Sequence, residues 1–478
     1  MADKTGNSRA KVALILATSV LAFLGAAYFA WHSSKVIAVA SAYYAKTLCS
    51  SVFVAGRDEA RAVSEDVLAD MTVGLRHWRR DVFRDRNLVE VSLFGFAKRA
   101  ALYRPGLGCT LVLDTSVETL REQAPQYVAP LPANRPAALW PEGNQVVLYG
   151  ETQGVDTAKL KEVVEAAFFE PRPKRALRRT QAVIVVHKGK ILAEQYADGI
   201  SPDTPRPGWS MGKTVLSALI GTLVKDKKFA LSRDKLFPEW RGDDDPRGRI
   251  TGDHLLRMVS GLEFDAPHAR MLSDVRKMLF VKGDSAAYAK SEKLDDPIGS
   301  TWFYASGSTT LLASAMRDAI EGPLAQYWSY PWKTLFEPLG MNSAMMEVDA
   351  AGTFLAPAFV HASPRDWARF GLFYLNDGVW NGKRLLPEGW VDMQRTPTSQ
   401  SGGEYGAHLW LKIPDFLRPA YADKYPIPED AFFMLGHDGQ MVAMIPSREL
   451  VIVRLGLTRR RNAWDHEVFL HAILSALK

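Results

Sequence analysis

The sequence has few of the features that mark metal, redox or nucleotide-binding proteins. Only two cysteines occur in 478 residues, and no Cys/His spacing typical of a zinc site is present. No Walker-type glycine loop and no internal repeat occur either. The net charge of +6 is small for this length, so it does not predict a nucleic-acid-binding surface. We therefore expect no metal, no cofactor and no nucleic-acid partner.

A regular alternation of strands and helices is also lacking, which argues against a doubly wound parallel sheet. Strand-like apolar runs lie at 182–199, with a turn at Lys188-Gly189, and at 432–456 near the C-terminus. The segment from about 210 to 395 has helical patches, and 466–478 predicts a closing amphipathic helix. We expect an α/β (α+β) fold with an antiparallel sheet flanked by helices, plus a helical lobe.

An uncharged apolar run extends over residues 12–31. At a rise of about 1.5 Å per residue, a helix of this length matches a hydrocarbon core of about 30 Å. Basic residues in the preceding tail, 1–11, predict that the tail is cytoplasmic. We expect a single-pass inner-membrane anchor with the rest of the chain on the periplasmic side. A signal peptide cleaved near Ala38-Val39-Ala40 is the alternative, although the apolar run is long for one.

Downstream of the anchor we expect an N-terminal module over 32–170, a basic linker over 171–179 and a hydrolase domain over 180–478. In the module, spacing predicts a helix within 58–80, a strand at 88–95 and a helix at 156–169. Cys49 and Cys109 both fall on the exported side, where two thiols usually pair. The alternative is two buried, inert thiols.

Two serine motifs overlap within residues 208–219, GWSMGKTVLSAL. Gly208 to Gly212 fits G-x-S-x-G, in which a strand runs directly into the nucleophile of an α/β-hydrolase, whereas Ser210 and Lys213 fit S-x-x-K. Three prolines within 198–208 argue against a central strand before Ser210. Apolar residues after Ser210 keep helical spacing, so Lys213 lies on the same face. A partly desolvated lysine has a lowered pKa and can act as a base.

S-x-x-K also occurs at Ser8, Ser232 and Ser475, so the spacing alone is weak evidence. Two further motifs, in chain order, favour Ser210. Tyr304-Ala305-Ser306 precedes an apolar helical run. A tyrosine at such a loop-to-helix junction can reach into a cleft, where its hydroxyl can pass protons between nucleophile and leaving group. His437-Asp438-Gly439-Gln440 follows a strand-like run, where the amide of Gln440 can form an oxyanion hole with that of Ser210.

These three motifs together resemble those of the penicillin-recognising serine hydrolases, which include class C β-lactamases, DD-peptidases and related esterases. The segments ITGDHLLRMVSGLEF, LFEPLGMNSAMM and SPRDWARFGLFYLNDGVWNGKRLL are similar to the branch of 6-aminohexanoate-dimer hydrolases. The resemblance covers about 180–475 and implies a serine β-lactamase-like fold without a metal or cofactor. It implies that Ser210 is the nucleophile, Lys213 the base and Tyr304 the proton donor, with the substrate and oxyanion side formed by Ser306, His437, Asp438, Gly439 and Gln440.

Three positions depart from the β-lactamase pattern. Ser306 stands where asparagine is usual, His437 where lysine is usual, and Asp438 where a hydroxyl residue is usual. An acid facing the cleft would repel the carboxylate of penicillins and D-Ala-D-Ala peptides, so we expect a small neutral ester or amide substrate. The alternatives are β-lactamase or DD-peptidase activity, or a non-catalytic relative that binds cell-wall peptide.

Overall fold

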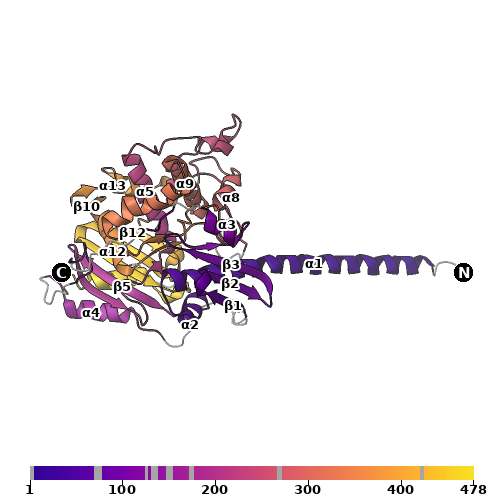
Figure 1. Ribbon diagram of the computed structural model, residues 1–478, viewed down its shortest axis with the longest axis horizontal. Coiled ribbons are helices and arrows are strands. Elements are labelled where there is room, and N and C mark those ends of the chain that lie inside the picture. Colours follow the sequence, from indigo (N-terminus) through magenta and orange to yellow (C-terminus); the bar gives the residue numbers. More distant parts are fainter. Residues whose placement is uncertain are drawn as a thin grey trace.

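The chain is built on two larger antiparallel sheets from which one long helix projects (Figure 1). The computed structural model describes residues 5–68, 78–123, 127–130, 138–146, 154–171, 177–265, 272–419 and 425–477. The helices are α1 (Thr5–Cys49), α2 (Glu59–Arg61), α3 (Val117–Glu122), α4 (Thr157–Ala166), α5 (Gly212–Lys225), α6 (Gly252–Leu256), α7 (Asp274–Phe280), α8 (Ser285–Ser291), α9 (Ser306–Ile320), α10 (Leu324–Pro331), α11 (Glu337–Leu339), α12 (Pro364–Leu375), α13 (Trp390–Arg395) and α14 (His466–Leu474). The strands are β1 (Arg79–Phe83), β2 (Leu88–Leu93), β3 (Phe96–Arg104), β4 (Gly108–Leu111), β5 (Thr180–His187), β6 (Lys190–Tyr196), β7 (Arg206–Pro207), β8 (Met345–Met346), β9 (Val360–Ala362), β10 (Val379–Trp380), β11 (Lys383–Arg384), β12 (Phe432–Gly436), β13 (Gln440–Ile445) and β14 (Leu450–Gly456).

The larger sheet has the order β12-β13-β14-β5-β6, and every neighbouring pair is antiparallel. Lys188 and Gly189 join β5 to β6 with positive φ angles of 49° and 74°, as a tight hairpin requires. Alternate residues of β5 belong to two different cores, because Ile184 packs with α12 whereas Val185 packs with α4 and α14. The sheet is therefore covered by helices on both faces, which confirms the predicted architecture.

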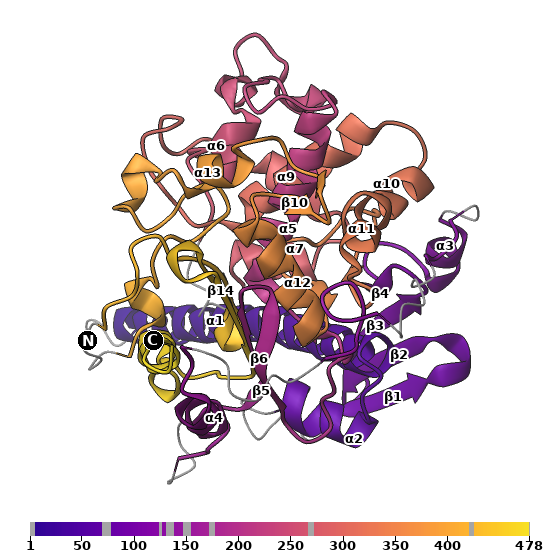
Figure 2. The same cartoon turned by 90° about the vertical axis from the view of Figure 1, so that its left-hand side faces the viewer.

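The helical lobe is centred on α5 and stands above the sheet in Figure 2. Its apolar residues occur at helical spacing and nearly all of its side chains are buried. The surrounding helices α9, α10 and α12 contribute to the same core. An antiparallel sheet with a helical lobe is the arrangement expected from the sequence, and it holds α5 rigidly in the interior.

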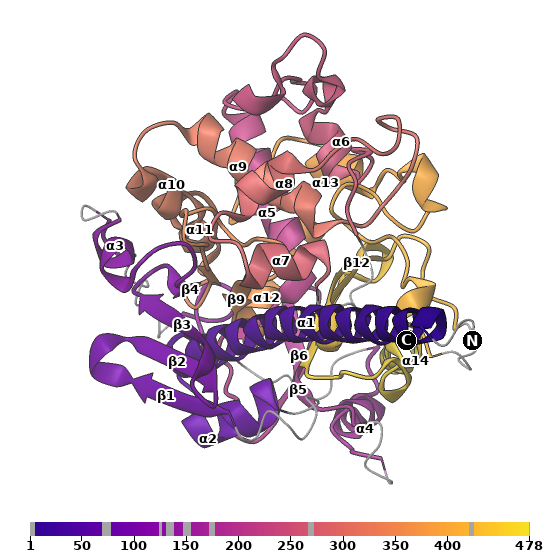
Figure 3. The same ribbon diagram turned by 90° about the vertical axis from the view of Figure 1, so that its right-hand side faces the viewer.

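Helix α1 is 45 residues long and has two parts of different character. Apolar side chains in the first part are exposed, among them Phe23 and Phe29 at 73% each. From Val39 onward the helix is buried in a core with β2, β3 and β4. Within the described residues, α1 is long and apolar enough to cross a membrane by length and composition. Figure 3 looks onto the face from which it projects.

The second sheet, with the order β1-β2-β3-β4, packs against the buried part of α1. Cys49 at the end of α1 forms a disulfide with Cys109 in β4, which confirms the predicted pair. Of the helix expected within 58–80, the described residues are helical over 59–67, whereas Arg79 and Arg80 belong to β1. Pairing of β1 with β2 prevails over the local helical spacing there. Residues 69–77 lie outside the described part.

Reduction of the disulfide is expected to lower the thermal stability. The bridge closes a loop with a sequence separation of 60 residues, which in the chain-entropy model stabilises the fold by about 4 kcal/mol. Differential scanning calorimetry should therefore show a lower Tm in the presence of a reductant. A Cys49→Ser/Cys109→Ser variant should have the low Tm under both conditions. Equal Tm values for the reduced and oxidised native protein would contradict the prediction.

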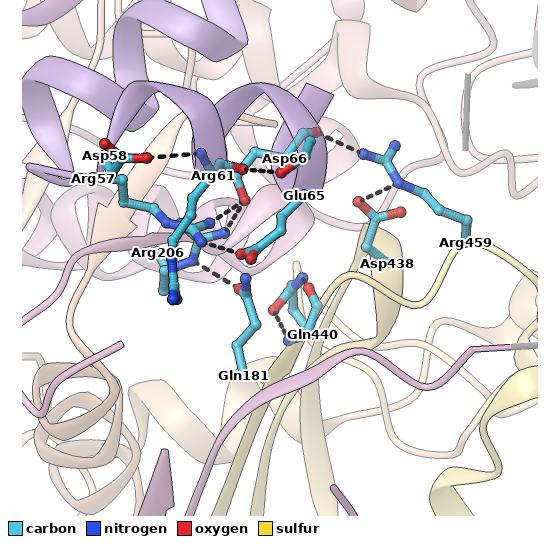
Figure 4. A network of polar contacts seen from close by, with 12 residues as sticks. Arg57, Asp58, Arg61, Glu65, Asp66, Gln181, Arg206, Asp438, Gln440 and Arg459 are labelled. Atoms are coloured by element: carbon cyan, nitrogen blue, oxygen red, sulfur yellow. Dashed lines mark hydrogen bonds and ion pairs between the residues drawn. The ribbon is translucent and has the colours of Figure 1, made fainter. Parts of the chain in front are cut away.

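Charged side chains fix the N-terminal module against the larger domain. Asp66 accepts hydrogen bonds from Arg57 and from Arg206, at 2.8 Å for the latter, and Arg206 also donates to Gln181 at 2.8 Å (Figure 4). Helix α4 packs against β6 and α14, although the expected boundary assigned it to the N-terminal module. Residues 172–176 of the expected linker lie outside the described part.

Candidate active site

Ser210 lies in a 3₁₀ turn, Trp209–Met211, directly before α5. The preceding β7 pairs antiparallel with β9, and the amide of Gly208 donates to Val360 O at 2.8 Å. A nucleophile elbow needs a parallel strand at this point, so the G-x-S-x-G interpretation is excluded. Gly212 lets the start of α5 approach the neighbouring loop, since a Cβ there would lie 2.3 Å from Ala356 O.

Lys213 reaches back toward Ser210 from the first turn of α5. Its Nζ lies 2.9 Å from Ser210 Oγ, 3.5 Å from Ser306 Oγ and 3.3 Å from Pro357 O. The side chain is 1% exposed, and burial lowers its pKa from 10.5 to about 7. A substantial fraction of this lysine is therefore neutral at neutral pH and able to accept the Ser210 proton.

Tyr304 approaches Ser210 from the extended segment before α9. Burial raises the pKa of its hydroxyl to about 12, although the Ser210 and Trp410 side chains lower that pKa in part. Its ring centroid lies 4.8 Å from Lys213 Nζ. A phenol with this pKa remains protonated at neutral pH and can donate a proton to a departing group.

The third motif closes the other side of Ser210. Gly436, the last residue of β12, packs tightly against the backbone that precedes Ser210. A Cβ on Gly436 would lie 2.2 Å from Gly208 O. The Gln440 side chain is held by the backbone of Gly456 through both its amide nitrogen and its carbonyl oxygen. The Gln440 side chain is thus engaged within the sheet and does not reach a substrate. The carbonyl of Gly439 is fixed by Arg454 at 2.9 Å.

His437 and Asp438 contact each other, with His437 Nε2 3.0 Å from Asp438 Oδ1, although only His437 is exposed. The His437 side chain is 58% exposed and packs edge-on against Trp209 at 5.3 Å, so it borders the site. Asp438 has a φ of 64°, and its carboxylate is fully buried beside Arg459, with Oδ2 3.4 Å from Nε. The expectation that Asp438 faces the cleft is therefore corrected. Its charge lies between His437 and Arg459, because the left-handed backbone turns the side chain inward.

Several residues near the site belong to no recognisable sequence motif. Trp410 and Tyr405 pack against the Tyr304 ring at 5.1 and 5.7 Å and form an aromatic wall. His408 is buried between Thr309 and Leu256, and burial lowers its pKa to about 3, so it braces the lobe as a neutral ring. Arg459 contacts Asp438 and donates to the carbonyl of Asp66 (Figure 4). It also donates to the hydroxyl of Tyr43 in α1. These residues lie outside the three motifs and are identified only by the fold.

Comparison with known proteins agrees with this geometry. The family model of the β-lactamases matches residues 166–476. The 6-aminohexanoate-dimer hydrolase of Paenarthrobacter ureafaciens is 25% identical over 230 residues, which cover 45% of this chain and 56% of that protein. The chain thus matches only about half the length of this relative.

Solved structures of low sequence identity share the fold. A penicillin-binding protein homologue from Caulobacter crescentus is 15% identical with a TM-score of 0.51, covering 67% of this chain and 98% of the other. A family VIII carboxylesterase is 14% identical with a TM-score of 0.50, covering 69% and 100%. With the family model matching more than half of its length, the chain belongs to the β-lactamase family and is a serine hydrolase.

Proposed function

We propose that this protein hydrolyses a small ester or amide through an acyl-enzyme on Ser210, while α1 anchors it in the inner membrane. The observation that carries the proposal is the 2.9 Å contact between Lys213 Nζ and Ser210 Oγ, in surroundings that lower the lysine pKa to about 7. Ser306 and Tyr304 complete the polar environment of the same two groups.

In the acylation step, neutral Lys213 accepts the proton of Ser210 as Oγ attacks the substrate carbonyl carbon. The developing oxyanion accepts hydrogen bonds from the backbone amides of Ser210 and Gln440. The amide of Ser210 lies in the first turn of a helical segment, where it has no intrahelical acceptor. Tyr304 gives its proton to the leaving alcohol or amine and regains one from protonated Lys213. In deacylation, water attacks the acyl carbon while neutral Lys213 accepts its proton and Tyr304 orients the water; Ser210 Oγ then leaves and takes that proton from Lys213.

The substrate class follows from the relatives and from the rim of the site. Ester and amide hydrolysis are the activities that the names of the carboxylesterase and the 6-aminohexanoate-dimer hydrolase indicate. The exposed ring of His437, in place of the usual lysine, leaves the third motif without a permanent cation for a substrate carboxylate. Since the Asp438 carboxylate is buried, its charge does not contribute to this preference, which rests on the relatives, on His437 and on the aromatic wall.

The anchoring is supported by the exposed apolar part of α1 and by the basic tail before it. The Cys49–Cys109 disulfide supports an oxidising compartment such as the periplasm. Carbonate-washed membranes should retain the protein, and external protease should digest its bulk in spheroplasts. Release by carbonate, or protection from protease, would contradict this location.

The hydrolytic proposal is tested with the detergent-solubilised full chain on matched neutral and anionic substrates. A chromogenic short-chain ester, a linear amide and nitrocefin should be compared for kcat/KM. We expect turnover of the neutral ester or amide to exceed that of nitrocefin. Faster hydrolysis of nitrocefin than of every neutral substrate would favour a β-lactamase instead.

Replacing Tyr304 by phenylalanine is expected to lower kcat/KM, which reports the acylation step, by about 100-fold, the lower range for loss of one general acid. The phenyl ring keeps the packing against Trp410 and Tyr405, so the Tm should change little. The loss should be smaller for esters with good leaving groups, which need less protonation. An equal loss for all leaving groups would show that Tyr304 does not act as the acid.

A further inference from the structure

The tip of the hairpin formed by β2 and β3 carries two phenylalanines, which the geometry of the turn does not require. Leu93 pairs with Phe96, which leaves Phe94 and Gly95 as the two turn residues, with φ angles of 49° and 82°. A two-residue turn of this type strongly favours Asn-Gly, and a bulky residue with positive φ is strained. Phe94 and Phe96 are each 77% exposed. The tip therefore presents two aromatic rings to its surroundings at a cost in backbone strain.

This tip lies beside the point where α1 leaves the domain. An open hollow of about 560 Å³ separates the two and is lined on the helix side by Ser34, Lys35 and Ile37, and on the hairpin side by Phe94, Phe96 and Arg99. Strands β2 and β3 are seen next to the exit of α1 in Figure 1. Leu93, in contrast, packs into the core that buries α1. The outward rings thus lie at the level of residues 33–38 of the helix.

That level coincides with the expected boundary of a bilayer. The apolar run of α1 ends at Trp31, and Lys35 follows about 6 Å farther along the axis at 1.5 Å per residue. The headgroup layer on each side of the hydrocarbon core is about 5–7 Å thick. Trp31 is 53% exposed, and Lys35 Nζ lies 3.8 Å from its ring centroid. Aromatic and basic residues of this kind gather where a helix crosses the interface.

We propose that the β2–β3 hairpin tip is a second membrane contact of this protein. Phe94 and Phe96 enter the boundary between acyl chains and headgroups of the leaflet from which α1 emerges, and Lys35 and Arg99 face its lipid phosphates. Lys98 adds a further cation beside the tip, although Glu90 accepts from it at 2.7 Å. The contact rests on the proposed anchoring by α1. A single helix leaves the domain free to rotate about its axis, whereas two contacts fix the face that the domain turns toward the bilayer.

The full-length protein offers a direct test, because both native cysteines are in the disulfide. Phe94→Cys is labelled with the environment-sensitive dye NBD and reconstituted in vesicles of phosphatidylethanolamine and phosphatidylglycerol with doxyl-labelled lipids. Phe169→Cys is the matched control. Phe169 is also an exposed phenylalanine, at 67%, but it follows α4 on the far side of the domain from α1 (Figure 1). Flotation after a carbonate wash measures the α1 anchor separately.

The label at position 94 should have blue-shifted emission and be quenched several-fold more strongly by shallow doxyl lipids than the label at 169. Equal quenching at the two positions, in vesicles that carry the protein, would overturn the second contact while leaving the anchor intact. Loss of the protein on carbonate washing would overturn the anchor instead. In that case, quenching at 94 before the wash still supports the hairpin contact, and its absence refutes it.

Discussion

Replacing Lys213 by methionine is expected to lower kcat/KM by about 10³- to 10⁴-fold, the upper range for loss of a general base. Methionine fills a similar volume and needs no hydrogen bond, so the buried position tolerates it. Lys225→Met is the matched control, because this lysine is exposed at the other end of the same helix. It should retain full activity. A Lys213→Met variant with near-native kcat/KM would exclude the lysine as the base.

The pH profile gives an independent measure of the same group. Lys213 acts as a base only when neutral, and burial lowers its pKa to about 7. The kcat/KM of the native enzyme should therefore rise with pH through about 7 and then level off. Tyr304, with a pKa of about 12, stays protonated across this range. The residual activity of Lys213→Met should lack the rise. If the rise of kcat/KM with pH persists in Lys213→Met, the titrating group is not Lys213.

Replacing Lys46 by methionine is expected to lower the free energy of unfolding by about 3–5 kcal/mol, the usual cost of removing one partner of a buried ion pair. Lys46 Nζ lies 2.7 Å from Glu347 Oε2, and both side chains are fully buried. Although burial raises the pKa of Glu347, the charges of Lys46 and His361 lower it overall to about 2. Without Lys46 this carboxylate would remain in the core with less compensation. Urea denaturation measures the change.

A double variant separates the charge from the packing. Lys46→Met/Glu347→Gln removes both charges, and a glutamine oxygen can still accept from Ser50 and from the amide of Cys109, which lie 2.9 and 2.7 Å from Glu347 Oε1. We expect it to be more stable than Lys46→Met alone. Because Lys46 belongs to α1 and Glu347 to the larger domain, a weak effect of Lys46→Met would show that this pair does not hold the module in place.

Much of the larger domain follows from local sequence patterns. Lys188-Gly189 between two apolar runs predicts the β5–β6 hairpin, because the turn needs positive φ angles that glycine adopts readily. Ser210 and Lys213 are brought together by one helical turn, so their contact can be predicted from spacing. Their proximity to Ser306 and Tyr304 is predicted only by the family resemblance, because about 90 residues separate the two motifs and local spacing gives no distance over that length.

The remaining features depend on tertiary contacts. The inward turn of Asp438 depends on Arg459 and on the backbone angle at one residue, and neither appears in the motif. The strand at Arg79 forms because β2 supplies its hydrogen-bond partners. Nothing in the local sequence around Lys46 marks it as the buried partner of Glu347, about 300 residues away. The same holds for Asp66 and its partner Arg206, more than a hundred residues away.

The most direct test of the central claim is the identity of the acylated residue. The full-length enzyme should be treated with a fluorophosphonate and, separately, quenched during turnover of a neutral ester, then digested and analysed by tandem mass spectrometry. We predict a single modified serine, Ser210, with both reagents, and no adduct on Ser210→Ala. Modification that persists in Ser210→Ala, or an adduct mapped to another serine of the native enzyme, would contradict the account.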